Sequence, residues 1–241
     1  MKSILCFGDS NTWGFIPGTG SRFPFTVRWP GLVQAALGSD IRVLEEGLSG
    51  RTTVHDDPHT DNRNGRRQLV FLLESHAPLD LVIVMLGTND LKHRFGLSAS
   101  DIADANGVLL AQIQTSNAGI AGGPPAALLL SPPLFNPDNG PEWPDFEGAT
   151  AKSLAFAPRY EETARSHGAA FFDAATVARP SPVDRLHLDA SGHRALAHAL
   201  VPVISGMLGL STPDCQVLDT PETCDSDGAH PTLNTEGDRV S

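Results

Sequence analysis

The sequence predicts an α/β protein, a three-layer α/β/α sandwich in which helices cover both faces of a parallel β-sheet. Three observations support this class: five short apolar segments recur along the chain, helix-period segments separate them, and most apolar segments are continuous rather than alternating. Continuous segments are typical of strands covered on both faces, and regular strand-helix alternation is typical of a doubly wound sheet. The 241 residues suffice for one such domain.

The expected strands are short, and the first lies at the N-terminus. In a flavodoxin-like strand order of 2-1-3-4-5, the first and third strands are neighbours, and their carboxyl ends meet where the winding of the sheet reverses. Ligands bind at that edge of open parallel sheets, so the residues after these two strands are the first candidates for a site. The expected strands cover residues 4–7, 41–44, 81–86, 126–130 and 169–172.

Five segments with helical periodicity lie between and after the strands. In the last of them, apolar residues recur three or four positions apart, which indicates one buried stripe. The expected helices cover residues 30–37, 66–76, 102–114, 148–167 and 190–208.

Two long segments, residues 16–29 and 132–147, interrupt this alternation. Both combine proline with aromatic residues. Loops of this length are uncommon without a purpose. Two interpretations stay open: surface loops closed by small aromatic clusters, or a pocket wall or a contact within a homo-oligomer.

The composition changes sharply after residue 210. Residues 211–241 hold seven acidic residues against one basic residue, Arg239, and almost no apolar clusters. Such a segment cannot bury enough surface to offset the entropy of ordering it. The sequence therefore predicts a domain over residues 1–210 and an acidic, flexible tail over residues 211–241.

Composition also argues against several classes of partner. The net charge is −11 and no basic stripe is present, so nucleic acid is not expected to bind. No apolar run approaches the roughly 18 residues of a membrane span, and the N-terminus lacks a signal-peptide pattern, so no membrane partner is expected. Three cysteines, an odd number, favour a cytoplasmic location over a disulfide framework, although Cys215 and Cys224 could pair on oxidation.

Polar residues follow the first and third strands. Ser10 follows the first strand in the motif GDS, and Asn89 follows the third in the motif GTND. If these strands are neighbours, both side chains face one crevice, where a hydroxyl can act as nucleophile and an amide N–H can stabilise an oxyanion by about 3 kcal/mol. Taken alone, the GDS motif is better explained by a turn or helix cap.

The loop before the last expected helix carries Asp184 and His187, three positions apart. A serine hydroxyl is a poor nucleophile until a base takes its proton, and a carboxylate orients that base. One short segment supplies both groups. For this pair alone, a structural histidine bonded to the backbone is an equally good interpretation.

Four blocks in order resemble the signature of the GDSL-like, or SGNH, hydrolases. The resemblance covers residues 3–208, and the sequences CFGDSNTWG, EEGLSGRTT and MLGTND are similar to those of its bacterial arylesterase and acyltransferase branch. The blocks are GDS at 8–10, the turn that contains Gly50, GTND at 87–90 and DxxH at 184–187.

The resemblance implies a role for each matching residue. Ser10 is the implied nucleophile, His187 the base and Asp184 the carboxylate that orients it. The implied oxyanion donors are the backbone N–H groups of Ser10 and Gly50 and the side chain of Asn89. The family implies no metal and no organic cofactor.

Residues around these blocks are expected to bind substrate. Asn11 stands where the branch often has an apolar residue, which would make the acyl pocket more polar. Arg51 is expected to pair with an acid of the segment HDDPH at 55–59 or to contact a polar substrate group. That segment resembles a metal-ligand cluster, but its spacing favours a solvated loop. The expected substrate-binding residues are Asp9, Asn11, Trp13, Phe15, Arg51, Phe135 and Trp143, with Phe146 as a further aromatic candidate.

The sequence therefore predicts a serine esterase that hydrolyses short-chain acetyl or aryl esters through an acyl-serine intermediate. Its partners are a small-molecule ester and a water or alcohol acceptor. Three alternatives stay open: acyl transfer to alcohols, deacetylation of acetylated carbohydrates, and a non-catalytic binding module on the same scaffold.

Overall fold

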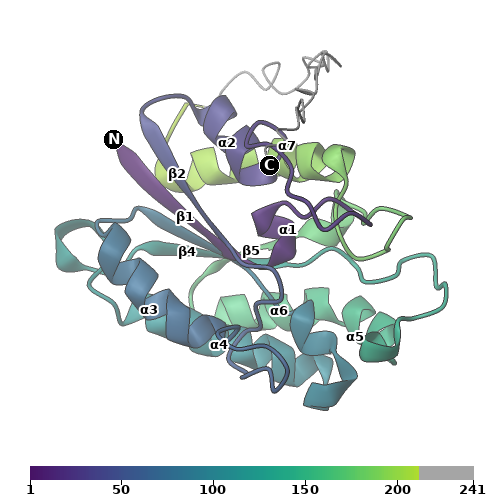
Figure 1. The fold of residues 1–241 in the computed structure, drawn as a ribbon. Coiled ribbons are helices and arrows are strands. Elements are labelled where there is room, and N and C mark those ends of the chain that lie inside the picture. The colour runs from purple at the N-terminus through teal and green to yellow at the C-terminus, as the bar shows by residue number, and fades with distance from the viewer. Residues whose placement is uncertain (212–241) are drawn as a thin grey trace, which may run out of the picture.

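A five-stranded parallel sheet forms the centre of the computed structural model, which describes residues 1–211. The strand order β2-β1-β3-β4-β5 confirms the predicted fold class, and every expected strand is present (Figure 1). The tail over residues 211–241, including Cys215 and Cys224, lies outside the described residues except for Ser211. The strands are β1 (Lys2–Gly8), β2 (Ile41–Gly47), β3 (Leu81–Met85), β4 (Ala126–Ser131) and β5 (Ala170–Asp173).

Helices cover both faces of the sheet (Figure 1). On one face, α2 (Trp29–Leu37) packs against α7 (Ala190–Leu208). On the other face, α4 (Ala99–Gln114) packs between α3 (Gly65–His76) and α6 (Phe156–Ser166). The layers are therefore those that the sequence predicts.

Residues 148–167 form two helices, and the expectation of one continuous helix was wrong. The first, α5 (Ala149–Leu154), ends before α6 begins at Phe156. Pro158, the third residue of α6, gives the physical reason. Proline has no N–H to donate to the carbonyl four residues earlier, so it is tolerated in the first turn of a helix but not in the interior of a longer one.

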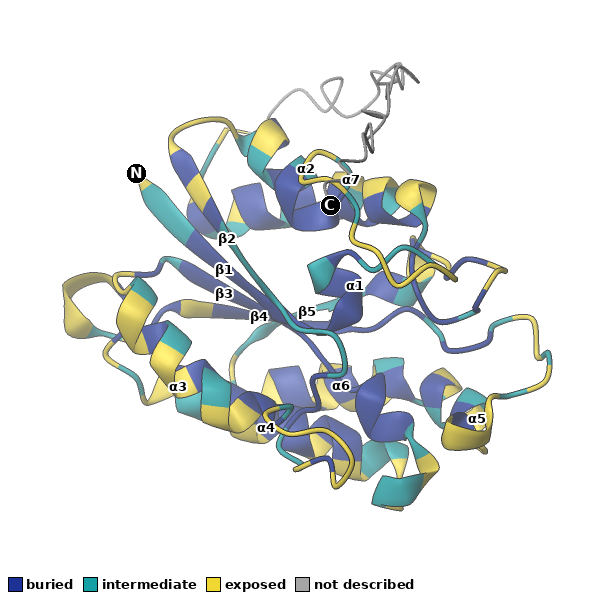
Figure 2. Cartoon of the chain, viewed as in Figure 1, coloured by how far each residue is buried: buried dark blue, intermediate teal, exposed yellow. Residues whose placement is uncertain are grey.

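The apolar core has two halves, one on each face of the sheet. Because successive strand residues point to opposite faces, Leu5 and Phe7 of β1 join the half under α3, α4 and α6, whereas Ile4 and Cys6 join the half under α2 and α7. The strands are buried between the helices in Figure 2. Cys6 is a free thiol with no exposed surface, as a small buried hydrophobe should be.

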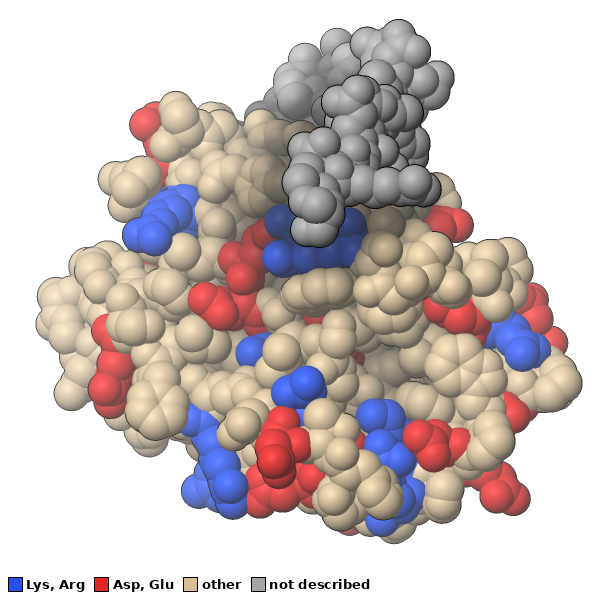
Figure 3. Space-filling view, viewed as in Figure 1, with Lys and Arg blue, Asp and Glu red and all other residues tan. Residues whose placement is uncertain are grey.

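Charged side chains lie on the outside of this sandwich. Lys and Arg are interspersed with Asp and Glu on the face in Figure 3. Within residues 1–211, none of the helices combines the length and the apolar character that a membrane span needs.

His193 connects α7 to α2 inside the core. Its Nδ1 accepts a hydrogen bond from the backbone N–H of Trp29 at 3.3 Å, and its ring meets the ring of Phe23 edge-on. Burial lowers the pKa of His193 from 6.5 to about 4. The imidazole is therefore neutral in the folded protein at neutral pH.

The wild-type protein should lose stability in acid relative to a His193→Gln variant. Between pH 6.5 and about 4, this histidine binds a proton in the unfolded chain but not in the folded one. The free energy of unfolding should therefore fall by about 1.4 kcal/mol for each unit by which the pH is lowered. Glutamine can accept the Trp29 hydrogen bond but does not titrate. Urea unfolding of both proteins at neutral and mildly acidic pH measures the difference, and an equal pH dependence would contradict a buried neutral ring.

Candidate active site

Three side chains from opposite ends of the chain meet at the carboxyl edge of the sheet. Ser10 begins the short helix α1 (Ser10–Trp13) directly after β1, and Asp184 and His187 lie in the loop before α7. The Nε2 atom of His187 lies 3.0 Å from Oγ of Ser10, and its Nδ1 atom lies 2.8 Å from Oδ2 of Asp184. All three residues are more than nine-tenths buried. The hydroxyl, the imidazole and the carboxylate thus form one hydrogen-bonded chain.

The carboxylate of Asp184 also shapes the loop that carries His187. Its Oδ1 atom accepts the backbone N–H groups of Leu186 at 3.1 Å and His187 at 2.9 Å. Burial alone would raise the pKa of Asp184, but the hydrogen bonds from the His187 ring and from these two N–H groups outweigh it and lower the pKa below the usual value. Asp184 is therefore ionised at neutral pH, the state in which it can hold the Nδ1 proton of His187.

Asn11 fixes the same loop against α1. Its Nδ2 donates to the carbonyl of Leu186 at 3.3 Å, and its Oδ1 accepts the N–H of Leu188 at 2.9 Å. These bonds occupy the buried amide, so the structure places Asn11 behind the loop that carries His187 and not among the residues that line the cleft. Because Asn11 follows Ser10 directly, its two bonds connect the start of α1 to the loop that carries His187.

Phe15 covers the outer face of the imidazole. Its ring stacks on that of His187, with centroids 4.1 Å apart and planes at 24°. Phe15 also lines the cleft, as expected. The stacking holds the plane of the base and shields it from water on one side.

The expected oxyanion donors lie beside Ser10. As the first residue of α1, Ser10 has a backbone N–H with no acceptor within the helix. Gly50 has φ +82°, a conformation that glycine adopts readily, and a Cβ atom there would lie 3.3 Å from Nε of Arg63. Asn89 begins the 3₁₀ turn η1 (Asn89–Leu91), and its Nδ2 donates to the carbonyl of Arg51 at 3.1 Å. This bond uses one of the two amide N–H groups, so the other remains for a substrate oxygen.

Asp90 connects the segment of Gly50 to the turn of Asn89. Its fully buried carboxylate accepts the hydroxyl of Thr53 at 2.6 Å and the backbone N–H of Thr53 at 3.0 Å. Nδ1 of His55 lies 2.9 Å from the same carboxylate, and this hydrogen bond raises the pKa of His55. The segments that carry Gly50 and Asn89 are therefore held together by buried hydrogen bonds.

The structure buries Arg51 away from the cleft and from the acids of residues 55–59. Its guanidinium donates to the carbonyls of Gly8 and Glu46 and lies 4.2 Å from the ring centre of Phe7. Burial lowers the pKa of Arg51 to about 10. Arg51 thus connects the ends of β1 and β2, and this interior position differs from both expected contacts.

Asp9 is also buried and does not line the cleft. Its carboxylate accepts the backbone N–H of Asn11 at 2.9 Å and so caps α1. Burial raises the pKa of Asp9 to about 6, against the hydrogen bond from Asn11. The helix-cap interpretation of the GDS motif therefore applies to Asp9, while Ser10 faces the cleft.

A cleft of about 520 Å³ opens over Ser10 and His187. Seven expected residues line it: Ser10, Phe15, Gly50, Asn89, Trp143, Phe146 and His187. Phe135 and Trp13 were also expected there but do not line it: Phe135 is buried behind Phe146, with ring centres 4.9 Å apart, and Trp13 lies under Arg22. The remaining lining residues are Ser49, Lys92, Pro144, Asp145 and Leu186.

Of these additional lining residues, the sequence offered a signal for only some. Ser49 and Leu186 adjoin motif residues, and Lys92 lies three positions after Asn89, one turn along a helical segment. Asp145 comes from a distant loop, and no spacing indicates its place.

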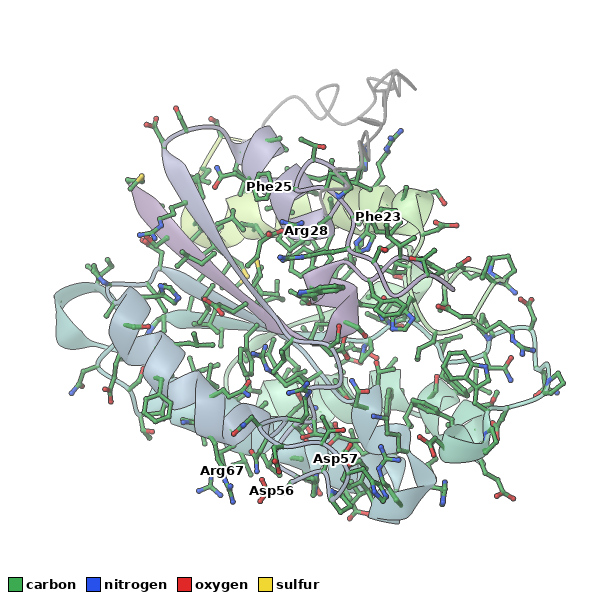
Figure 4. The ribbon with its side chains drawn as sticks, in the orientation of Figure 1. Phe23, Phe25, Arg28, Asp56, Asp57 and Arg67 are labelled. Atoms are coloured by element: carbon green, nitrogen blue, oxygen red, sulfur yellow. The ribbon has the colours of Figure 1, made fainter. Side chains whose placement is uncertain are left out.

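The two long loops have different positions. Residues 143–146 of the second loop line the cleft. Phe23 and Phe25 of the first loop gather beside α2 and α7, and Phe25 packs on Arg28 (Figure 4). The first loop is therefore held by packing, and the second forms a pocket wall.

The acids of residues 55–59 take part in ion pairs. Asp56 pairs with Arg67 at 2.7 Å, and Asp57 pairs with Arg94 at 3.0 Å. In residues 1–211, no group of three or more His, Cys, Asp or Glu side chains is placed to hold a metal ion.

Comparison with known proteins relates this chain to one protein family and to several solved structures. The model of the GDSL-like lipase/acylhydrolase family matches residues 6–195. The M. smegmatis aryl esterase is 41% identical with a TM-score of 0.81, and the match covers 86% of this chain and 100% of that chain. A carbohydrate acetylesterase family member from Sinorhizobium meliloti is 40% identical with a TM-score of 0.81, and the match covers 87% of this chain and 100% of that chain.

A putative arylesterase from Agrobacterium tumefaciens is similar to the same degree. It is 41% identical with a TM-score of 0.78, over 86% of this chain and 100% of that chain. Comparison with curated proteins gave no match.

The family model spans the region that carries all four sequence blocks. The chain therefore belongs to the GDSL-like lipase/acylhydrolase family and is a carboxylic ester hydrolase.

Proposed function

We propose that the protein hydrolyses short-chain acyl esters, acetyl and aryl esters among them, through an acyl-Ser10 intermediate. The observation that carries this proposal is the hydrogen-bonded chain from Ser10 Oγ through His187 to Asp184, with distances of 3.0 and 2.8 Å. A base within hydrogen-bond reach of the nucleophile, itself oriented by a carboxylate, is the geometry that acyl transfer to serine needs.

In the first half-reaction, Ser10 Oγ attacks the ester carbonyl and His187 Nε2 takes the hydroxyl proton. The backbone N–H groups of Ser10 and Gly50 and the amide of Asn89 stabilise the oxyanion. The intermediate collapses, the bond to the alcohol oxygen breaks, and His187 returns its proton to the leaving alcohol. Water or a second alcohol then attacks the acyl-Ser10 by the same route, which releases an acid or a new ester.

The acyl chain should be short because one cleft of about 520 Å³ must hold both halves of the ester. We expect kcat/KM for p-nitrophenyl esters to fall steadily as the acyl chain lengthens from acetyl to octanoyl. A preference for long acyl chains would contradict this part of the proposal.

Transfer of the acyl group to an alcohol is a separate question. When the reaction contains an alcohol, product analysis by chromatography measures the share of the acyl group that is transferred.

A second candidate substrate is an acetylated carbohydrate. Trp143 keeps about a third of its surface exposed at the cleft, and Lys92 and Asp145 place polar groups beside it. Flat aromatic and hydrogen-bonding surfaces together suit a sugar ring, and a carbohydrate acetylesterase family member is among the similar structures. Acetate release from acetylated xylose, measured beside p-nitrophenyl acetate, distinguishes the two substrates.

Replacing Asn89 by alanine should lower kcat by about 10²- to 10³-fold if its amide binds the oxyanion. KM should change little, because this bond strengthens mainly in the transition state. Steady-state kinetics on p-nitrophenyl acetate measures both constants, and thermal unfolding checks that loss of the bond to Arg51 leaves the fold intact. A loss confined to KM would assign Asn89 to ground-state binding instead.

The expected homo-oligomer and cytoplasmic location stay predictions. Phe71 on α3, which is 70% exposed, is a candidate contact in such an assembly. Sedimentation velocity measures the assembly state, and a monomer at micromolar concentration would contradict it. Cell fractionation tests the location.

A further inference from the structure

A chain of ion pairs connects three segments that contribute residues to the cleft. The carboxylate of Asp57 lies 3.0 Å from one terminal nitrogen of Arg94, and the other terminal nitrogen lies 3.1 Å from Oδ2 of Asp145. Lys92 Nζ lies 3.8 Å from Asp57 as well. We call this set, Asp57, Arg94 and Asp145, the Arg94 bridge.

The Arg94 bridge joins three of the chain segments that contribute residues to the cleft. Asp57 ends the segment that begins at Gly50, and Arg94 follows Asn89 and Lys92 in the next segment. Asp145 lies within residues 143–146, the aromatic wall that includes Trp143 and Phe146. The bridge therefore connects the segments that carry Gly50 and Asn89 to the aromatic wall.

The two halves of the bridge differ in burial. The Asp57 side chain is 1% exposed and also accepts the backbone N–H of His59, so its pairing with Arg94 is shielded from solvent. The Asp145 side chain is 58% exposed. One charge-assisted bond thus holds the guanidinium from the inside, and the second lets it hold a surface segment on the outside.

The aromatic wall has few other polar attachments to this side of the cleft. His93 Nδ1 lies 3.2 Å from the backbone oxygen of Asp145, and the wall otherwise rests on aromatic packing, with Phe146 stacked on Phe135. Loss of the Arg94 contact should let residues 143–146 move, because stacked rings fix an orientation less strictly than ion pairs with two partners.

We propose that Arg94 is a positioning residue that holds the Trp143–Phe146 wall in place and thereby selects esters with a ring in the alcohol half. The inference rests on the proposed function, in which aryl and carbohydrate esters carry their ring in that half. Because Arg94 keeps the wall ordered before the substrate binds, binding does not include the free-energy cost of ordering it. Loss of Arg94 should therefore weaken substrate binding and raise KM.

The test compares KM and kcat for phenyl acetate and ethyl acetate in wild type and four variants. Arg94→Gln removes both ion pairs, and Asp145→Asn removes only the outer one. The matched control is Arg67→Gln, which breaks the neighbouring pair with Asp56 at the lower edge of the molecule in Figure 4; both of those side chains are more than half exposed, and neither lines the cleft. The double variant, Arg94→Gln with Asp145→Asn, measures coupling.

We expect Arg94→Gln to raise KM for phenyl acetate about fivefold, with KM for ethyl acetate and both kcat values changed less than twofold. Asp145→Asn should give a smaller rise of the same kind, and the double variant should resemble Arg94→Gln alone. Arg67→Gln should behave as wild type. If Arg94→Gln does not fold because Asp57 loses its partner, Asp145→Asn carries the test alone, since it leaves the inner pair intact.

Equal changes for the two esters, a loss in kcat alone, or additive effects in the double variant would overturn the inference. These outcomes are distinct from failure of the proposed function. If wild-type protein hydrolyses neither ester, the proposed function fails; if it hydrolyses both and Arg94→Gln leaves the ratio of the two KM values unchanged, only the role of Arg94 fails.

Discussion

Replacing Ser10 by alanine should lower kcat for p-nitrophenyl acetate by about 10⁴- to 10⁶-fold, the range seen when the nucleophile of a serine-histidine-aspartate triad is removed. The variant retains no hydroxyl for acyl transfer, and what activity is left comes from the oxyanion donors and substrate binding. The fold should be unaffected, because the Ser10 hydroxyl bonds to His187 at the floor of the cleft and not to the core.

Ser49→Ala is the matched control for this experiment. Ser49 lines the same cleft, and its buried hydroxyl has no hydrogen-bond partner in the part of the chain that the structure describes. Its loss should leave kcat within about twofold of wild type, because no proton path reaches it. A Ser10→Ala variant that turns over at the wild-type rate, or a Ser49→Ala variant that does not, would contradict the assignment of the nucleophile.

Replacing Asp184 by asparagine should lower kcat by about 10⁴-fold. The asparagine amide can donate a hydrogen bond toward Nδ1 of His187, which favours the tautomer with a proton on Nε2. In that tautomer Nε2 cannot accept the Ser10 proton. The geometry stays close to wild type, because asparagine keeps an oxygen for the N–H groups of Leu186 and His187.

Asp189→Asn is the matched control. It tests whether the loss of another carboxylate near His187 in the chain also lowers kcat. Asp189 caps α7 through the backbone N–H of Gly192 at 2.8 Å, and asparagine caps helices equally well. Stopped-flow or steady-state kinetics should therefore show wild-type turnover for Asp189→Asn. An Asp184→Asn variant with the same turnover would mean that the carboxylate does not orient the base.

The layers of the fold could be predicted because local signals agree with the tertiary structure. Continuous apolar runs such as that of β3 are buried on both faces, and the periodicity of α7 matches its buried stripe. The helical periodicity of residues 148–167 continues past Pro158, whereas proline's missing N–H marks the start of α6 and so divides the segment.

The chain of Ser10, His187 and Asp184 could be expected because each residue lies at a strand end or in a short motif, and topology brings such positions to one edge. The direction of a side chain could not be predicted in the same way. Asn11 bonds to a segment some 175 residues away, and Arg51 turns inward because two carbonyls accept its guanidinium. Contacts of this kind depend on packing across the whole domain, and the spacing of residues in the sequence does not predict them.

Labelling with a fluorophosphonate, followed by peptide mass spectrometry, tests the central role of Ser10 most directly. We predict that the probe modifies the Ser10 peptide, that esterase activity falls in proportion to labelling, and that Asp184→Asn is labelled much more slowly than wild type. Labelling at another residue, or full activity in protein whose Ser10 is completely modified, would contradict the account.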